Sequence, residues 1–310
     1  MDCQSQFLGT ILQVCLQVNI GEGMANYNTG IEWCEATWNV VTGCDKVSSG
    51  CKHCYAERMS KRLAGRFGYP ADDPFKVTLH EDRLQEPEDR KKPTKYFVCS
   101  MGDIFHEDVP FDFIDLVIAE IAMCPQHEFI MLTKRADRML AYMKSRQRKD
   151  TPQGNEWFCK AWEKFKGRAI TGKEAFHLLD LEWPLPNLTL MVSVEDQPTA
   201  DLRIPDLLLT PAAKRGVSYE PALGPVIFDP YLKVRRIAGK PGDLNPKNFL
   251  PSLDLIIAGG ETGHSPRPDN VEWYRETAYQ SKHAGVAFYM KQRSGKAAIP
   301  KDLQIKQWPE

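Results

Sequence analysis

Short apolar runs rich in β-branched and aromatic residues recur along the chain and alternate with amphipathic helical patterns. Helical periodicity is clearest over residues 111–124, 136–145 and 271–285. Alternation of strands with helices indicates βαβ units, which give a parallel sheet with right-handed crossovers. The predicted strands are 31–41, 96–100, 128–133, 188–194, 216–221, 255–260 and 287–292.

This number of units in a chain of 310 residues fits one barrel better than two separate domains. We therefore predict an α/β fold, a partial or full β/α (TIM-like) barrel over residues 24–310. Residues 146–186 interrupt the alternation, because the spacing between neighbouring strands is too long here for a plain βα crossover. We expect a helical insertion at this position.

Basic residues are concentrated around the predicted insertion. Residues 134–173 contain twelve basic and four acidic side chains, whereas the whole chain has a formal net charge of −1. Trp157, Phe158, Trp162 and Phe165 alternate with lysines there. Because cations neutralise phosphates and aromatic rings stack on unpaired bases, the segment favours nucleic acid as a partner. The alternative is an amphipathic helix whose aromatic residues pack on the barrel and whose lysines are solvated.

The first 23 residues differ in composition from the rest of the chain. They are moderately apolar, carry only Asp2 and Glu22 as charged residues, and lack the features of a signal peptide. We predict that 1–23 is an N-terminal extension, and two interpretations stay open. Met24 is the natural start in one, and the segment forms a helix packed on the barrel in the other.

The overall composition narrows the class of protein. No apolar run approaches the roughly 20 residues needed to span a bilayer. The chain has 40 Lys+Arg and 41 Asp+Glu, which excludes a protein that is basic throughout. Its nine cysteines are odd in number and irregularly spaced, unlike a secreted disulfide scaffold. We expect a cytoplasmic protein with no membrane partner and with thiols available for metal.

Three cysteines form the strongest chemical motif. Cys44, Cys51 and Cys54 have the spacing C-x6-C-x2-C, and the link between the first two contains Ser48, Ser49 and Gly50, which permit a tight loop. A helical pattern follows Cys54. Three thiolates are one ligand fewer than a closed structural metal site holds.

The missing ligand leaves two interpretations. A [4Fe–4S] cluster held by three cysteines keeps one iron open for S-adenosylmethionine. A zinc ion instead takes His53, Cys34 or a more distant residue as its fourth ligand. Adjacent residues rarely face one metal, so His53 is expected to point away from Cys54. Cys34, Cys99 and Cys124 lie in predicted strands or on a helix face and are expected to be structural.

Several segments together resemble a phage-encoded radical-SAM-like family of uncharacterised function, from about Gly30 to the end of the chain. The radical SAM superfamily is normally marked by C-x3-C-x2-C, from which this sequence departs by its longer first spacing. The resemblance implies a [4Fe–4S] cluster, S-adenosylmethionine and an electron donor. The segments that carry it are TWNVVTGCDKVSSGCKHCYAERM, SMGDIFHEDVP, LTKRADRM, VSVEDQ and GGETG.

The resemblance also suggests cofactor-binding residues at the ends of predicted strands, where barrel sites lie. Asp103 is the candidate for the methionine amino group, and Ser193 and Glu195 follow the strand whose end often contacts the ribose. Lys134 and Arg135 are candidates for a substrate phosphate or carboxylate. The full set of cofactor candidates is Ser100, Gly102, Asp103, Ser193, Glu195, Glu220, Gly259, Gly260 and Glu261. The acidic members have an alternative role as helix caps or first-turn acids.

The sequence therefore predicts a radical SAM enzyme that abstracts hydrogen from a nucleic-acid or nucleotide-derived substrate. It identifies no catalytic acid, base or hydrogen donor. One alternative is a zinc-stabilised nucleic-acid-binding protein without catalysis. Another is a barrel that has kept a cluster and lost its radical chemistry.

Overall fold

The computed structural model describes most of the predicted barrel. The predicted N-terminal extension, residues 1–23, lies outside the described residues, as does much of the predicted insertion. The described residues are 29–146, 156–167, 181–232, 235–236, 249–250 and 252–309.

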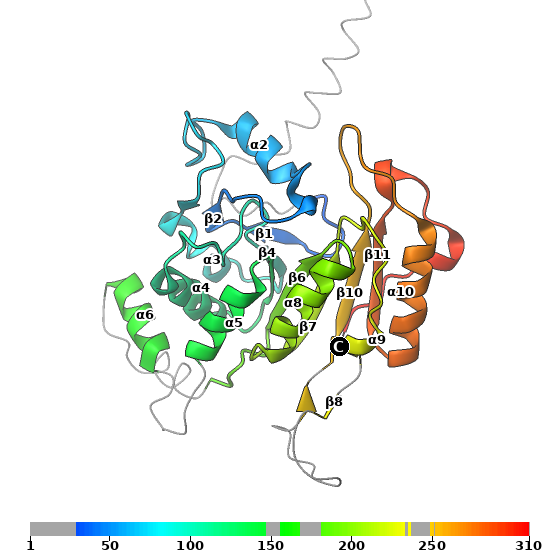
Figure 1. Cartoon of the computed structure of the whole chain (residues 1–310). Coiled ribbons are helices and arrows are strands. Elements are labelled where there is room, and N and C mark those ends of the chain that lie inside the picture. Colours follow the sequence, from blue (N-terminus) through cyan, green and yellow to red (C-terminus); the bar gives the residue numbers. More distant parts are fainter. Residues whose placement is uncertain are drawn as a thin grey trace, which may run out of the picture.

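A single curled sheet of seven parallel strands organises the fold (Figure 1). The strands follow one another in space in the order in which they occur in the chain, and every pairing between them is parallel. Since the first and last strands are not paired with each other in the described part of the chain, the sheet is a half-barrel. This confirms the partial β/α barrel. The strands are β1 (Ala36–Trp38), β4 (Lys95–Val98), β5 (Glu128–Thr133), β6 (Leu188–Val194), β7 (Lys214–Tyr219), β10 (Leu255–Gly259) and β11 (Ala287–Gln292).

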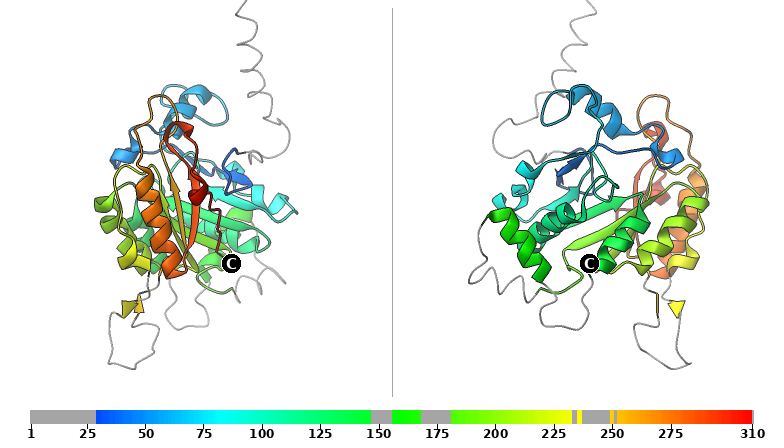
Figure 2. Two further views of the ribbon diagram at one scale, coloured as in Figure 1. Left: turned by 90° about the vertical axis from the view of Figure 1, so that its right-hand side faces the viewer. Right: turned by 60° about the vertical axis from the view of Figure 1, so that its left-hand side comes forward.

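Helices cover the outer face of this sheet (Figure 2). Three of them agree with the predicted helical periodicity to within one residue: α4 (Phe111–Met123), α5 (Ala136–Ser145) and α10 (Val271–Ala284). The last ends at Gly285, which adopts the left-handed conformation with φ of 72°. The remaining helices are α2 (Tyr55–Leu63), α3 (Glu86–Asp89), α6 (Glu156–Lys166), α8 (Gln197–Leu209) and α9 (Asp229–Leu232).

Alternate residues of the strands enter two separate cores, because successive strand side chains point to opposite faces. Tyr96 and Val98 join the large cluster beneath the outer helices, whereas Phe97 between them joins the cluster on the inner face. Trp33, from the turn before β1, is a buried member of this inner cluster, and Trp308, near the end of the chain, packs against it. The predicted first strand is therefore shorter than expected, since residues 31–34 form a covering turn.

Short elements complete the structure near the sheet ends. Two antiparallel pairs join β2 (Val41–Thr42) to β3 (Thr78–Leu79) and β8 (Arg235–Arg236) to β9 (Phe249–Leu250). The 3₁₀ turns are Ser49–Cys51, Glu81–Arg83, Ser294–Lys296 and Lys301–Leu303. None of the helices in the described ranges is long and apolar enough to cross a membrane.

The described aromatic residues of the predicted insertion belong to the core. Helix α6 packs on α4, and the Trp162 side chain is 1% exposed. Trp157 and Phe165 pack against the same cluster, and the Trp157 ring lies edge-on to Trp183 with 5.6 Å between centroids. Trp162 is therefore not available to stack on bases, and Trp157 and Phe165 are partly buried by the same packing. For the described residues the amphipathic-helix interpretation is the correct one.

Gly43 is a sensitive position because it joins β2 to the loop that follows. Its φ is +86°, and an added methyl group would overlap the Lys76 carbonyl oxygen. We expect Gly43→Ala to lower the free energy of unfolding by well over the roughly 1–2 kcal/mol that a left-handed residue costs by itself. Urea denaturation is the measurement. Gly285→Ala is the matched control, since its φ is +72° and nothing lies within 4 Å of the added atom; equal losses in the two variants would contradict the account.

Candidate functional site

The cysteine loop, residues 44–54, lies over the carboxyl ends of the parallel strands. The Gly43 amide donates to the Met101 carbonyl at 3.0 Å, which ties the start of the loop to the end of β4. Ser48 Oγ donates to Glu195 after β6 at 2.9 Å. Arg267, in the segment between β10 and α10, donates from Nη1 to the Ser49 carbonyl at 2.9 Å. Contacts with three strand ends therefore place the loop at the edge where β/α barrels carry their sites.

The three motif cysteines are free thiols that are neither fully buried nor fully exposed. Arg135 Nη1 donates to Cys44 Sγ at 3.4 Å, and Ser48 Oγ lies 3.8 Å from Cys51 Sγ. Burial, together with the nearby Asp103 carboxylate, raises the pKa of Cys44 to about 11, although Arg135 opposes the shift. By contrast, the cysteines predicted to be structural are all buried: Cys34, Cys99 and Cys124.

The cysteine loop has donor atoms of a suitable chemistry for a metal, but the structure does not bring them together around one point. Among residues 29–309 that the structure describes, no group of three or more His, Cys, Asp or Glu side chains is arranged to hold a metal ion. In the described residues the three sulfurs are therefore not gathered around a common centre. The chemistry of the donors nevertheless fits a soft metal, because three free thiols share one short loop beside a guanidinium that stabilises thiolate.

The alternative fourth ligands for zinc are engaged elsewhere. His53 Nδ1 lies 2.9 Å from Glu261 Oε2, so this side chain turns to the end of β10. Cys34 is 8% exposed and belongs to the inner core. The expectation that His53 points away from the cysteines agrees with this arrangement.

Glu195 connects the cysteine loop to the sheet. Its side chain is 0% exposed, and both carboxylate oxygens are occupied by groups of the chain. Oε1 accepts from Ser48 and lies 3.1 Å from Lys134 Nζ, while Oε2 lies 3.0 Å from Arg203 Nη1. A methyl group at Gly50 would overlap this carboxylate, so glycine is required for the close approach of the loop.

Asp103 forms a second buried connection, between the ends of β4 and β5. Thr133 Oγ1 donates to both carboxylate oxygens, at 2.8 and 2.9 Å, and Arg135 Nη1 lies 3.3 Å away. The Arg135 side chain is 4% exposed and also bonds Glu107 at 3.0 Å. Since Arg135 contacts Cys44 as well, this pair links the β4 and β5 ends to the first cysteine.

Glu261 binds the other side of the cysteine loop. Its carboxylate accepts from the Arg267 amide at 2.8 Å and from Arg267 Nε at 3.1 Å, besides its contact with His53. Burial acts to raise the pKa of Glu261, but the hydrogen bonds from Arg267 and His53 prevail and lower it to about 2. The charged form is therefore strongly favoured in the folded state.

This shift predicts a pH-dependent stability. The folded pKa is depressed from 4.5 to about 2, so ionised Glu261 stabilises the fold above pH 4.5 and this contribution is lost as the pH falls toward 2. We expect Glu261→Gln to lower the free energy of unfolding on the order of 2–3 kcal/mol at pH 7. Urea titrations of both proteins should show a difference that shrinks below pH 4.5. A constant difference down to pH 2.5 would contradict the assignment.

The remaining predicted residues also lie at this edge, with partners from the chain. Glu220 Oε1 lies 3.1 Å from Lys291 Nζ, and Ser100 Oγ donates to Asn39 Oδ1 at 3.1 Å. Ser193 is 4% exposed. Gly259 and Gly260 were expected to permit close approach of a nucleoside, and Gly102 to lie with Asp103 near the methionine amino group. In the structure each of these glycines permits a close contact with another part of the chain. Gly102 lies against the backbone of Val41 and Gly43, Gly259 against the Glu220 side chain, and Gly260 against Ser294.

Sequence reasoning missed several residues that organise the site. Arg203 lies on α8, a helix that was not predicted although Asp196 caps it and Pro198 lies in its first turn. Pro205 inside this helix weakens its sequence signal. Asn39 accepts from Ser100 and Met101, and its position directly after β1 was the available signal.

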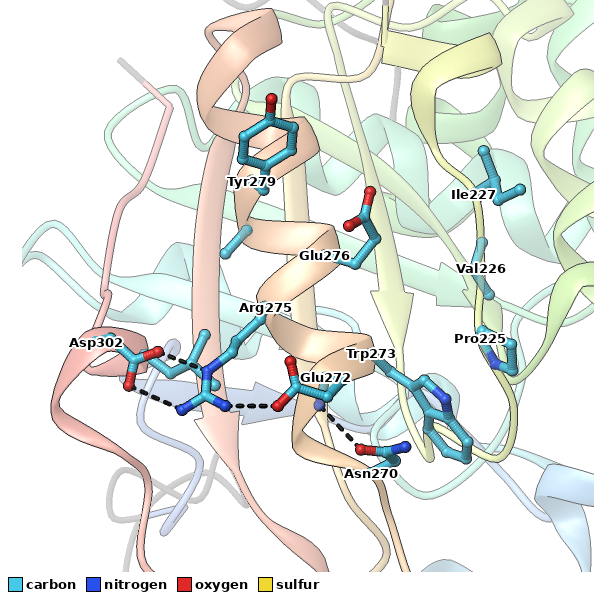
Figure 3. Close-up of a pocket in the computed structure, with 12 residues that line it drawn as sticks. Pro225, Val226, Ile227, Asn270, Glu272, Trp273, Arg275, Glu276, Tyr279 and Asp302 are labelled. Atoms are coloured by element: carbon cyan, nitrogen blue, oxygen red, sulfur yellow. Dashed lines mark hydrogen bonds and ion pairs between the residues drawn. The ribbon is translucent and has the colours of Figure 1, made fainter.

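A groove on the surface lies away from the cysteine loop. It has a volume of about 660 Å³ and lies beside α10, where Trp273 and Glu276 point toward the segment that contains Pro225, Val226 and Ile227 (Figure 3). Arg275 at its rim is paired with Glu272 and Asp302. The groove contains none of the predicted site residues.

Fold and site together define an α/β half-barrel protein with a three-cysteine loop at the carboxyl edge of its sheet. The chain belongs to the family described as "Protein of unknown function (DUF5131)", whose model matches residues 28–305. A search of curated proteins finds no match. Among solved structures, the chain is similar to "Spore photoproduct lyase complexed with dinucleoside spore photoproduct", with a TM-score of 0.41 and 10% sequence identity. That similarity covers 86% of this chain and 78% of the other.

Proposed function

We propose that the protein is a radical SAM enzyme whose cluster is bound by Cys44, Cys51 and Cys54. The observation that supports this most directly is the position of the cysteine loop. Three free thiols share one loop, and buried Glu195 holds that loop over the carboxyl edge of a half-barrel. Thiolates are the usual ligands of a [4Fe–4S] cluster, and three of them leave one iron without a protein ligand.

The engagement of His53 and Cys34 elsewhere favours an open iron over a zinc ion that takes either of them as its fourth ligand. Within the described residues His53 is held by Glu261, and Cys34 is buried on the inner face of the sheet. When bound, such a cluster passes one electron from an external donor to S-adenosylmethionine, whose S–C5′ bond breaks to give methionine and a hydrogen-abstracting 5′-deoxyadenosyl radical. The residues of the chain would bind and orient the cluster and S-adenosylmethionine and keep water away from them.

The strand-end residues are proposed to form the cofactor pocket around the loop. They are Ser100, Gly102, Asp103, Ser193, Glu195, Glu220, Gly260 and Glu261. The carboxylates of Asp103, Glu195 and Glu261 already hold basic groups in place, so we assign them first to positioning the loop. Lys134, whose side chain is 19% exposed, is the stronger candidate for a substrate anion. Buried Arg135 is proposed to act on the Cys44 thiolate.

The test is release of 5′-deoxyadenosine. Anaerobically reconstituted protein, reduced by dithionite in the presence of S-adenosylmethionine, should form 5′-deoxyadenosine and methionine in equal amounts. Protein that holds an intact cluster and releases neither product would contradict the proposal, and would favour a barrel that keeps the cluster without radical chemistry.

A further inference from the structure

Helix α2 presents an exposed stripe directly after the third cysteine. Tyr55 and Met59 are 47% and 40% exposed, and Arg58 and Arg62 are exposed as well. Spacings of three, four and seven residues bring these four side chains onto one helical face. We call this set the α2 stripe. In Figures 1 and 2 the helix lies beyond the end of the sheet, apart from the helices that cover its outer face.

The cations of the α2 stripe lack acidic partners. Glu57 is the one acid on α2, and its carboxylate pairs with Lys46 and Lys61, each at 3.1 Å. Arg58 and Arg62 form no ion pair with any described residue. Unpaired, solvated guanidinium groups beside a candidate active site fit a polyanion, because phosphates neutralise them and release counterions.

The stripe also offers a fixed aromatic ring. The Tyr55 hydroxyl donates to the Ser100 carbonyl at the end of β4, so the ring is held in place while its surface stays half-exposed. The Arg58 guanidinium lies beside Gly263, in the loop after β10. A rigid ring loses little conformational entropy on stacking against a base.

From these contacts we propose that the α2 stripe binds single-stranded nucleic acid and directs it to the cysteine loop. The stripe spans about 10 Å from Tyr55 to Arg62, at 1.5 Å per residue, which suits one or two unpaired nucleotides rather than a duplex groove. As a statement about substrate, this inference rests on the proposed function. As a statement about binding, it stands on the charge and exposure of α2.

The experiment measures binding of fluorescein-labelled 12-nucleotide oligothymidylate and oligouridylate to the full chain by fluorescence anisotropy over a salt series. We expect Tyr55→Ala to raise Kd about five-fold or more. Arg58→Gln and Arg62→Gln should each reduce the slope of log K against log[salt] by roughly 0.7. Arg58 and Arg62 are exposed, so thermal melts of their variants should be unchanged, whereas Tyr55→Ala also removes the hydrogen bond to the Ser100 carbonyl and should lower the melting temperature slightly. The tighter of the two oligonucleotides identifies DNA or RNA as the favoured ligand.

Helix α10 supplies matched controls. Tyr279 is 59% exposed and Lys282, three residues later, is exposed too, so Tyr279→Ala and Lys282→Gln should leave Kd unchanged. Equal effects on the two helices, or competition by polyglutamate as strong as by the unlabelled oligonucleotide, would overturn the proposal. So would a concentration-dependent dimer that Tyr55→Ala abolishes, because the stripe would then be a self-association surface. If the protein takes up zinc and no iron but still binds the oligonucleotide through α2, the α2 stripe would remain a nucleic-acid-binding surface. Its role in directing a substrate to the cysteine loop would then be refuted.

Discussion

Anaerobically reconstituted Cys51→Ala protein should contain little iron or sulfide and should lack the brown colour of the unaltered chain. Cys51 is the middle one of the three proposed ligands, and the two remaining thiols should not hold a cluster of four irons. The fold should survive, because the Cys51 side chain is partly exposed and belongs to no hydrophobic cluster of the described residues. Iron and sulfide assays together with the absorbance near ~400 nm give the readout.

Cys34→Ala is the matched control for this experiment. It removes a thiol that is 8% exposed and packed on the inner face of the sheet, outside the cysteine loop. Its iron content should equal that of the unaltered protein. Full retention of iron and sulfide in Cys51→Ala, or loss in both variants, would remove the assignment of the three-cysteine site.

Glu195→Ala should cause the largest loss of stability among single substitutions at the site. The substitution leaves Arg203, whose side chain is 4% exposed, and largely buried Lys134 without their counter-charge. Removing one partner of a buried ion pair costs roughly 3–5 kcal/mol. It also frees Ser48, so the cysteine loop should become more susceptible to proteolysis. Urea denaturation and limited proteolysis measure the two effects.

Two further variants separate charge from packing in this result. Glu195→Gln keeps an acceptor for Ser48 and should protect the loop while still lowering the free energy of unfolding. Glu128 forms an ion pair with Lys95, and its side chain is 62% exposed. Glu128→Ala should therefore lower the free energy of unfolding by less than ~1 kcal/mol. A Glu195→Ala protein as stable as Glu128→Ala would show that Glu195 does not anchor the loop.

The strands and main helices were predictable because the local periodicity of apolar residues reflects which side chains are buried. All six runs predicted after residue 95 coincide with an observed strand to within two residues at each end, and β7 both begins and ends two residues earlier than predicted. Prediction failed where tertiary packing overrode the local pattern. Ile31, Trp33 and Cys34 are apolar because they cover the inner core, not because they extend β1. Helix α8 escaped notice because of Pro205.

At the site, the sequence located several residues at strand ends but gave none of their partners. Glu195 and Glu261 were correctly located at strand ends, and their roles depend on Ser48 and His53, which are 147 and 208 residues away along the chain. Such distant pairings have no local signature. For the same reason the aromatic residues of the insertion suggested a nucleic-acid surface, although Trp162 is buried against α4.

Quantification of metal and sulfide in anaerobically prepared protein tests the central claim most directly. The account predicts about four irons and four sulfides per chain, with little zinc. One zinc per chain with neither iron nor sulfide would contradict it, and would assign the cysteine loop to a structural metal.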